Sequence, residues 1–394
     1  MEKIWINIPD VLFFQEGPGV RNTQYTTEGV KLLNVANLVD GKVDLSKSDR
    51  YISEDEAYGK YKHFLCDAGD FVIASSGIKV EYIDKKMGFV DESMLPLCMN
   101  TSTIRFKVLD DNKLRIRYFM YYLKSQHFKD QLFKQITGSA QLNYGPSHLK
   151  KMIMPLISLS KQDEIIACMD KVQSVIEMRR QELVKLDDLI KARFVEMFGD
   201  PRSNPFSFDE WMLKDTCKVI TGNTPSRAVS EYYGNYVEWI KTDNIVSGLL
   251  NPTKATECLS EKGMEAGRIV ERDSILMACI AGSIASIGRV CVTDRTVAFN
   301  QQINAVVPEK YNVLFLYVLL QISKDYLVED VNMALKGILS KSKLEEKKFI
   351  VPPIELQNQF ADFVNQVNKS KVEVQKALDE TQKLFDSLMQ QYFG

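Results

Sequence analysis

The sequence predicts an α+β protein in which two similar globular domains are separated by two long antiparallel coiled-coil helices, arranged as a pseudo-twofold repeat. Three features of the chain support this architecture. An apolar heptad pattern occurs twice, a proline-containing motif precedes each heptad stretch, and each half also mixes short strand-like runs with helical patterns. Self-similarity over half of a chain indicates two copies of one module, so each functional feature is expected twice.

The two heptad stretches predict long helices that pack against each other. Each helix is expected to extend about 55 Å, at a rise of about 1.5 Å per residue. Arg179, Arg193, Lys371 and Thr381 interrupt the apolar seam, and polar residues at such positions can set the register or contact another subunit. The apolar seam positions are Ile165, Met169, Val172, Ile176, Leu183, Leu186 and Ile190 in the first helix, and Phe360, Val364, Val367, Val374, Leu378, Phe385 and Leu388 in the second.

Matching motifs bound the two heptad stretches. Each stretch follows a proline-containing motif, MPLISLSKQ in the first copy and VPPIELQ in the second. Each ends in a phenylalanine–glycine pair, within LIKARFVEMFG and LFDSLMQQYFG. These motifs predict a first globular domain over residues 1–155, a first helix over 156–200, a second globular domain over 201–353 and a second helix over 354–394.

Within each globular half, strand-like and helical patterns alternate. The runs VKLLNV and FVIAS in the first half, and YVEWI and SILMAC in the second, are β-rich and are bounded by Gly, Asp or Asn. Residues 115–136 and 313–331 have apolar residues at helical spacing. Trp5 and Trp211 open the two copies. Each half is therefore predicted to be an α+β domain with variable loops.

Three loops recur at matching places in the two halves. The first pair is EGPGVRN and TGNTPSR, the second is ASSGIK and AGSIASIGR, and the third is ITGSAQLNYG and LKGILSKSK. They combine Gly, which allows close approach of the backbone to a surface, with the polar and basic residue types that contact phosphates and base edges. Ordinary turns have a similar composition, so the loops alone do not establish a binding site.

The composition and the absent motifs exclude several classes of function. The seven cysteines include no CxxC pair and are expected to be small buried residues in a reducing compartment. No signal peptide or membrane-spanning run is recognisable, so we expect a cytoplasmic protein. The sequence has no HExxH, G-x-S-x-G, Walker A or dinucleotide-binding motif, and Asn251-Pro252 continues as Thr-Lys, unlike the NPPY-type motif of adenine methyltransferases. We therefore predict no catalytic residues, no metal and no cofactor.

Positive charge is concentrated locally, although the net charge of the chain is −2. Residues 101–151 contain ten Lys or Arg and three Asp, and residues 336–348 contain five Lys and two Glu. A basic segment thus recurs at the same place in each half. Such segments favour an anionic partner, or form a solvated helix surface.

Taken together, these motifs resemble the specificity subunit of type I restriction–modification enzymes. The resemblance covers essentially the whole chain and rests on the two-copy order, the PLISLSKQ and PPIELQ motifs, the phenylalanine–glycine endings, and the GNTPS loop followed by YVEWIKTDNI. The first half departs from the pattern, because EGPGVRN stands where G-x-T-P-S is common and SSGIK is shorter than its counterpart.

The resemblance implies a function and a set of partners. Each globular domain would be a target recognition domain that reads one half of a bipartite sequence in double-stranded DNA. The helices would be conserved spacers that dock methyltransferase subunits, two in number, and restriction subunits through them. Catalysis would belong to those partners, and no membrane is involved.

Direct readout of bases and phosphates suggests candidate contacts on the three loops of each half. They are Arg21, Gln24, Ser76, Lys79, Gln141, Asn143 and Tyr144 in the first half, and Asn223, Thr224, Arg227, Lys241, Asn244, Ser283, Gln301, Lys336, Ser340 and Lys341 in the second.

Two other interpretations remain open from the sequence. One is a non-catalytic structural adaptor whose two modules bind proteins on a coiled-coil rod, which predicts no salt-dependent DNA binding. The other is the DNA-recognition subunit of another restriction–modification type, which differs only in its partner.

Overall fold

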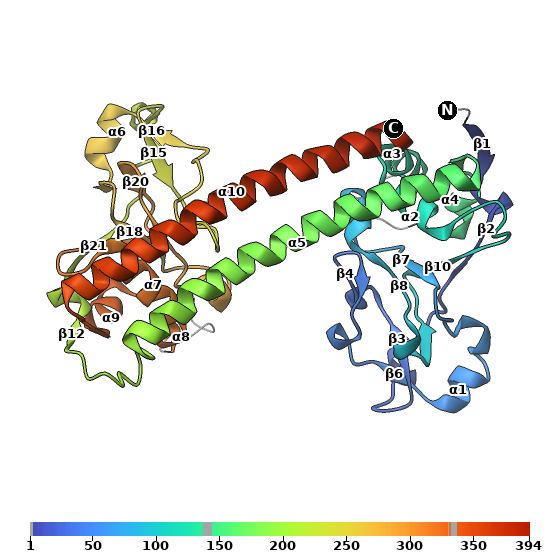
Figure 1. Ribbon diagram of the computed structural model, residues 1–394, viewed down its shortest axis with the longest axis horizontal. Coiled ribbons are helices and arrows are strands. Elements are labelled where there is room, and N and C mark those ends of the chain that lie inside the picture. The colour runs from blue at the N-terminus through green and yellow to red at the C-terminus, as the bar shows by residue number, and fades with distance from the viewer. Residues whose placement is uncertain (1–2, 137–143, 330, 332–336) are drawn as a thin grey trace. The chain divides into compact units, whose positions relative to one another are not determined.

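The computed structural model describes residues 3–136, 144–329, 331 and 337–394 (Figure 1). They form two compact units, which we call unit 1 (Met1–Glu177 with Asp379–Gly394) and unit 2 (Met178–Leu378). Each unit contains one α+β domain and a part of both long helices, which confirms the predicted fold class. Among the described residues, no helix has the length and apolar character needed to cross a bilayer.

The first sheet of each unit has four antiparallel strands. One of its inner strands is buried at all four residues, which explains why the runs FVIAS and SILMAC are rich in apolar residues. In unit 1 the order is β2 (Leu12–Glu16), β10 (Thr103–Val108), β7 (Phe71–Ala74) and β8 (Met87–Phe89). In unit 2 it is β13 (Cys217–Thr221), β21 (Ile303–Pro308), β18 (Ile275–Ala278) and β19 (Val290–Val292).

The second sheet of each unit contains a parallel pair of strands. In unit 1 the order is β6 (Tyr51–Ile52), β3 (Val30–Leu33) and β9 (Leu97–Met99), and β3 is parallel to β9. In unit 2 the order is β14 (Tyr233–Gly234), β16 (Cys258–Leu259), β15 (Val237–Ile240), β20 (Val297–Phe299) and β17 (Ile269–Val270), and β15 is parallel to β20. The repeat inferred from the sequence therefore extends to strand order and direction.

Small two-stranded ladders complete the β structure. The ladder that opens each domain joins its first strand to its last, pairing β1 (Ile4–Asn7) with β11 (Ile153–Leu156) in unit 1 and β12 (Glu210–Met212) with β22 (Lys348–Ile350) in unit 2. Unit 1 has a further ladder of β4 (Leu38–Val39) and β5 (Lys42–Val43). The strand that leads into each long helix is thus held by the start of its own domain.

The short helices cover the sheets. Helix α7 (Val313–Ile322) is apolar on nearly all sides and is almost entirely buried, as expected for a helix in a core. Its counterpart α2 (Ile116–Lys124) is also largely buried. Among the described residues, the other short α-helices are α1 (Glu54–Tyr58), α3 (Gln126–Gln135) and α4 (Pro146–Leu149) in unit 1, and α6 (Glu261–Ala266), α8 (Lys324–Val328) and α9 (Lys341–Glu346) in unit 2.

The long helices are α5 (Leu159–Phe198) and α10 (Ile354–Phe393), each of 40 residues or about 60 Å. A buried glutamine fixes the start of each one. The Gln162 side chain accepts a hydrogen bond from Arg115 N (2.8 Å) and donates to two carbonyls. Gln357 accepts from Asn312 N (2.9 Å) and donates to Pro352 O. The Gln of the LSKQ and IELQ motifs therefore ties each long helix to the helix α2 or α7 of its own domain.

The end of each long helix packs against the other globular domain. In unit 2, Phe194 and Phe198 of α5 surround Phe315 of α7 and Phe360 of α10, with ring centroids 4.8–5.6 Å apart for the pairs that join them. In unit 1, Phe393 of α10 lies 5.2 Å from Tyr118 of α2. The C-terminal end of α5 thus completes the core of unit 2, and the C-terminal end of α10 completes the core of unit 1.

The seam differs from a heptad pattern at these ends. None of the fourteen predicted seam residues is exposed. The heptad count continues to Met197 in α5, yet the structure buries Ile190, Phe194 and Phe198, four residues apart. The reason is that this part of α5 packs on a globular domain, where one face of a straight helix is buried, rather than along a supercoiled partner.

Two of the polar interruptions bind across the helix pair in unit 2. Lys371 Nζ lies 2.6 Å from Asp187 Oδ1 and donates to Gly248 O at 2.9 Å. The Arg179 guanidinium donates to the carbonyl of Ala377. These contacts fix the register of α5 against α10 and attach the pair to the loop around Gly248.

Most of the cysteines are buried, as the composition predicts, whereas Cys168 and Cys258 are half-buried. All seven are free, and Cys66, Cys98, Cys217, Cys279 and Cys291 are buried. Burial raises the pKa of each of these five thiols to about 12. They therefore pack as small apolar groups.

The aromatic packing at the helix ends generates a stability prediction. We expect Phe393→Ala to destabilise unit 1, and Phe198→Ala to destabilise unit 2, by about 3–5 kcal/mol each, because each removes a buried aromatic ring. Hydrogen–deuterium exchange should show faster exchange in peptides of the affected unit first. The controls Gln391→Ala and Val195→Ala alter exposed neighbours and should change stability by about 0.5 kcal/mol or less. Equal effects of Phe393→Ala on both units would contradict this assignment.

Candidate nucleic-acid interface

In unit 1 the three predicted loops meet at the turn Asn100–Ser102. This turn connects β9 of the second sheet to β10 of the first. Gly17 N of the first loop donates to Thr103 O (2.9 Å), and Ser75 N of the second loop donates to Ser102 O (2.8 Å). Tyr144 N of the third loop donates to Ser75 O (3.0 Å). Loops that are distant in sequence therefore lie side by side.

The same hydrogen bonds recur in unit 2 around the turn Asn300–Gln302. Gly222 N donates to Ile303 O (3.0 Å), Cys279 N to Gln302 O (2.8 Å) and Leu339 N to Cys279 O (2.8 Å). All of these bonds join backbone atoms, so they do not depend on which side chains the loops carry. The structure thus provides one frame on which two different sets of side chains are displayed.

A glycine in the first loop makes this frame possible. A Cβ added to Gly17 would lie 2.1 Å from Asn100 O, and a Cβ added to Gly222 would lie 2.1 Å from Asn300 O. No side chain fits at such a distance. EGPGVRN and TGNTPSR share little sequence, but each places a glycine at the point where the first loop touches the turn.

The predicted contacts of unit 1 fall into different environments. Arg21 and Lys79 are exposed, and Ser76 is half-buried. Gln24 donates to Glu56 Oε1 (2.6 Å) and to Tyr61 OH (3.1 Å), so its amide is engaged within the domain. Tyr144 is buried, and its hydroxyl donates to Ala74 O (2.9 Å). Gln141 and Asn143 lie outside the described residues.

In unit 2, several of the predicted contacts are grouped near the turn. Thr224 donates to the side chain of Gln301, and both are exposed. Asn223 donates to Ala266 O (2.9 Å). Ser283 is exposed and lies 3.0 Å from Ser286 through their hydroxyls.

The remaining predicted contacts of unit 2 have structural partners. Asn244 is buried, and its amide accepts from Lys241 N and donates to Lys254 O. Ser340 caps α9 by accepting from Lys343 N, and the exposed Lys341 pairs with Glu345 at 3.5 Å. Lys336 lies outside the described residues.

Arg227 and Lys241 belong to a cluster that includes aromatic rings and one carboxylate. The Arg227 guanidinium lies over the rings of Tyr233 (4.4 Å) and Trp239 (5.4 Å), and Lys241 lies over Trp239 (5.1 Å). Glu257 pairs with both cations at 2.6 Å. Hydrogen bonds from Lys241 and then Arg227 hold the pKa of Glu257 below its ordinary value, so this carboxylate stays ionised at neutral pH.

The sequence interpretation missed the rings and the carboxylate of this cluster. Tyr233 and Trp239 look like ordinary strand residues, and Glu257 lies in a stretch without a motif. The available signal was the alternation of Val237 and Trp239 with the charged Glu238 between them, which places Trp239 on the same strand face as Val237.

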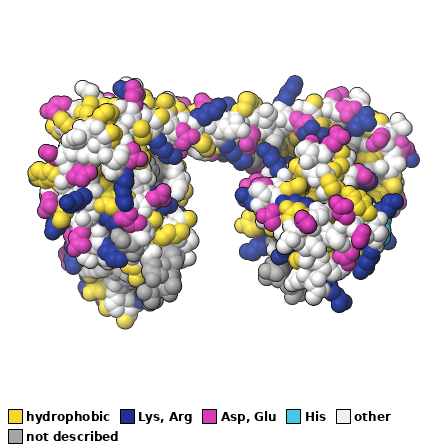
Figure 2. Space-filling view, turned by 90° about the horizontal axis from the view of Figure 1, so that it is seen from below, with side chains coloured by type: hydrophobic (Ala, Val, Ile, Leu, Met, Phe, Trp, Pro, Cys, Tyr) yellow, Lys and Arg dark blue, Asp and Glu magenta, His cyan; other side chains and the backbone are white. Residues whose placement is uncertain are grey.

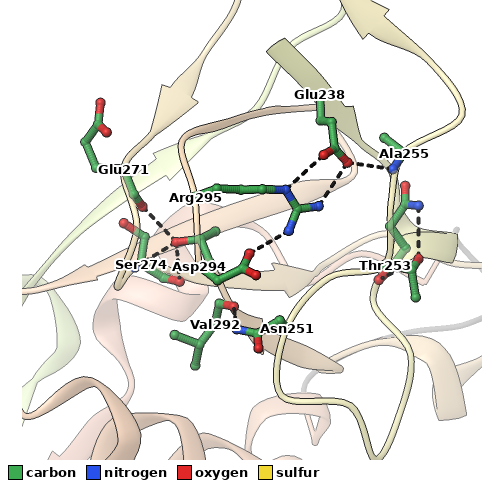
Figure 3. A network of polar contacts seen from close by, with 11 residues as sticks. Glu238, Asn251, Thr253, Ala255, Glu271, Ser274, Val292, Asp294 and Arg295 are labelled. Carbon is green, nitrogen blue, oxygen red and sulfur yellow. Dashed lines mark hydrogen bonds and ion pairs between the residues drawn. The ribbon is translucent and has the colours of Figure 1, made fainter.

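A second polar network supports the strand that carries Trp239. Figure 3 shows the Arg295 guanidinium between the carboxylates of Glu238 and Asp294. Glu238 also accepts from Ala255 N (2.7 Å), and Asn251 donates to Val292 O (2.8 Å). The segment before β16 is thereby held against β15 and β19, which fixes the position of Glu257.

The basic segment of unit 1 is largely neutralised within the domain. Six of its cations each lie within ion-pair distance of an aspartate: Arg105, Lys107, Lys113, Arg115, Arg117 and Lys129. In Figure 2, basic and acidic side chains are interspersed over the visible face of each unit. The local charge of the sequence therefore overstates the positive surface available to an anionic partner.

Comparison with known proteins assigns the chain to a family. Residues 26–187 and 207–382 each match the type I restriction modification DNA specificity domain. The chain therefore belongs to this family and contains two copies of its domain, as the resemblance in the sequence indicated.

Curated relatives carry the same description. The chain is 24% identical over 186 residues to the type I restriction enzyme MjaVIII specificity subunit of Methanocaldococcus jannaschii, which covers 46% of this chain and 42% of that protein. It is 30% identical over 212 residues to the type I restriction enzyme HindI specificity subunit of Haemophilus influenzae, covering 49% and 44%. The matched stretch spans less than half of the length of each relative.

Solved structures share the fold along nearly the full chain. The S subunit of a type I restriction–modification system from M. genitalium superposes with a TM-score of 0.55 at 16% identity, covering 98% of this chain and 95% of that one. A chain from a structure on complex assembly and conformational transition of the type I R-M system gives a TM-score of 0.56 at 16% identity, covering 99% and 97%. At this identity the likeness concerns the fold.

The glycines of the first loop generate a prediction. We expect Gly17→Ala and Gly222→Ala each to destabilise their unit by about 1–3 kcal/mol, because the new methyl group would push the loop away from the turn. Thermal unfolding measures the loss. Gly19→Ala and Gly282→Ala are matched controls, since a Cβ at either position meets nothing within 4 Å, and they should change stability by about 0.5 kcal/mol or less. A loss at Gly19 as large as at Gly17 would show that the close approach is not the cause.

Proposed function

We propose that this chain is the DNA-specificity subunit of a type I restriction–modification system, in which each unit reads one half of a bipartite sequence in double-stranded DNA. The observation that supports this most is the recurrence of one loop frame in both units of a chain whose two halves each match the family's DNA specificity domain. Two similar frames with different side chains suit two readers of different sequences.

The physical basis of reading is the exposed polar surface of the loops. Base edges are read by hydrogen bonds from side chains, whereas phosphates are held by cations, hydroxyls and backbone amides. The exposed candidates are Arg21, Lys79, Thr224, Arg227, Ser283, Gln301 and Lys341, and the half-buried Lys241 lies beside Arg227. We do not carry Tyr144 and Asn244 into this proposal, because both are buried and use their polar atoms within the domain.

We further propose that the long helices dock two methyltransferase subunits, and restriction subunits through them. Several large apolar residues on the helices remain exposed and are available to contact a partner. They are Met178, Val184, Leu189 and Val195 on α5, and Val372 and Leu384 on α10. Catalysis and cofactor binding would then belong to the docked subunits, so we expect no activity of this chain alone.

Methylation mapping tests the proposal. The host genome should contain a bipartite methylated sequence that disappears when the gene for this chain is deleted and returns on complementation. An unchanged methylome, together with no salt-dependent binding of duplex DNA by the chain, would instead favour the adaptor interpretation.

Separable recognition is the first prediction from this function. Exchanging residues 205–350 for the matching domain of a relative should change one half of the methylated sequence and leave the other half intact, because each unit has its own core and loop frame. Exchange of the whole chain is the control and should change both halves. A change in both halves after the domain exchange would contradict the two-reader proposal.

Helix length gives a second prediction. Inserting one heptad after Glu177 and another after Leu378 lengthens both helices by about 10 Å while leaving the Lys371–Asp187 pair within unit 2. The methylated half-sequences should be kept and the unread spacer should grow by about three base pairs, at about 3.4 Å each. Insertion after Glu177 alone shifts one helix against the other and should abolish methylation. A double insertion that methylates with the original spacer would rule out the helices as the determinant of spacing.

A further inference from the structure

A guanidinium lies over a tyrosine ring at the same place in both units. In unit 1, Arg50 lies over Tyr25 with its guanidinium carbon 5.2 Å from the ring centroid. In unit 2, Arg227 lies over Tyr233 at 4.4 Å. The two tyrosines correspond, because the residue after each of them pairs with the corresponding residue of β6 or β16, Thr26 with Tyr51 and Gly234 with Cys258.

The two arginines come from different parts of the chain. Arg50 precedes β6, and its carbonyl accepts from Leu32 N at 2.8 Å. The corresponding bond in unit 2 runs from Trp239 N to the carbonyl of Glu257 at 3.0 Å. Glu257 therefore occupies the backbone position of Arg50, while the guanidinium is supplied instead by the first loop. A guanidinium thus lies over the tyrosine ring in both units although it comes from different segments of the chain, which suggests that a cation at this position has a function.

Within the described part of the chain, the site in unit 2 has a carboxylate paired with its arginine and the site in unit 1 has none. Glu257 lies 2.6 Å from both Arg227 and Lys241, and the three side chains are 35%, 58% and 29% exposed. In unit 1, Arg50 donates to Tyr25 OH at 3.4 Å, and no carboxylate among the described residues is within ion-pair distance of it. Arg50 is therefore open to an external anion, whereas Arg227 and Lys241 are already paired with Glu257.

We propose that this arginine-on-tyrosine position is a site for the DNA phosphate backbone in each unit, and that in unit 2 Glu257 competes with the phosphate for this site and largely excludes it. The inference rests on the proposed function and adds to it a named residue that tunes affinity. A carboxylate and a phosphate both accept charge-assisted hydrogen bonds from a guanidinium and an ammonium, so one can replace the other. Glu257 thereby weakens binding of unit 2 to duplex DNA of any sequence.

The test measures binding of a mixed-sequence DNA duplex to the full chain over about 50–200 mM salt. Glu257→Gln should raise the affinity about three- to tenfold and steepen the slope of log affinity against log salt by about one, because one further phosphate contact is made. Arg50→Ala should lower the affinity and flatten the slope by about one. Glu309→Gln is the matched control: it removes one exposed carboxylate of the same unit, just beyond the end of β21 that is remote from the turn, and should change neither quantity appreciably.

A double substitution shows whether Glu257→Gln raises the affinity by freeing Arg227 or only by removing a negative charge. Arg227→Ala should have little effect in the original chain, where Glu257 already occupies Arg227, and should cancel most of the gain in the Glu257→Gln background. An equal loss on Arg227→Ala in both backgrounds would show that Arg227 binds DNA despite Glu257 and would overturn the proposal. Unchanged affinity or slope for Glu257→Gln, while the original chain binds DNA, would overturn it as well. If the original chain shows no salt-dependent binding, the proposed function falls and this inference falls with it.

Discussion

Aromatic packing at the helix ends is the constraint on which the two cores depend. Phe198 and Phe393 are buried at the C-terminal ends of α5 and α10. Phe198 packs in the core of unit 2 although α5 starts in unit 1, and Phe393 packs in the core of unit 1 although α10 starts in unit 2. The buried amides of Gln162 and Gln357 fix the opposite ends. With both ends of each helix held in a core, the register between the helices, set in unit 2 by Lys371 and Asp187, can be specific although the seam contains charged residues.

The loop frame separates structure from recognition. Backbone bonds join Gly17 and Ser75, or Gly222 and Cys279, to the turn between the two sheets and the first residue after it. Further backbone bonds join Tyr144 to Ser75, or Leu339 to Cys279. Only the glycine is required by contact with the turn. The other positions differ in chemistry between the units while keeping the same bonds, and this allows one fold to present two different surfaces.

The sequence was sufficient to predict the fold class and the repeat, because heptad spacing and duplicated motifs are properties of the chain itself. It was also sufficient to identify the three loops. It could not distinguish exposed loop residues such as Arg21 from buried ones such as Tyr144, since both lie in polar, glycine-containing segments. Nor could it reveal Glu257, because the link between Glu257, Arg227 and Trp239 depends on strand pairing between β15 and β16. The excess of basic residues in 101–151 did not predict a positive surface, because the fold places aspartates next to several of these residues and neutralises much of their charge.

The contribution of α10 to unit 1 has a consequence for biosynthesis. Phe385, Met389 and Phe393 are buried, yet they are translated after every residue of unit 2. The domain that emerges first from the ribosome therefore has to wait for the last helix before its apolar surface is covered, whereas unit 2 has all of its own residues earlier. Domains usually fold in the order of their synthesis. Here the order of completion is reversed, and the nascent first domain is the part of this chain that most needs protection from aggregation.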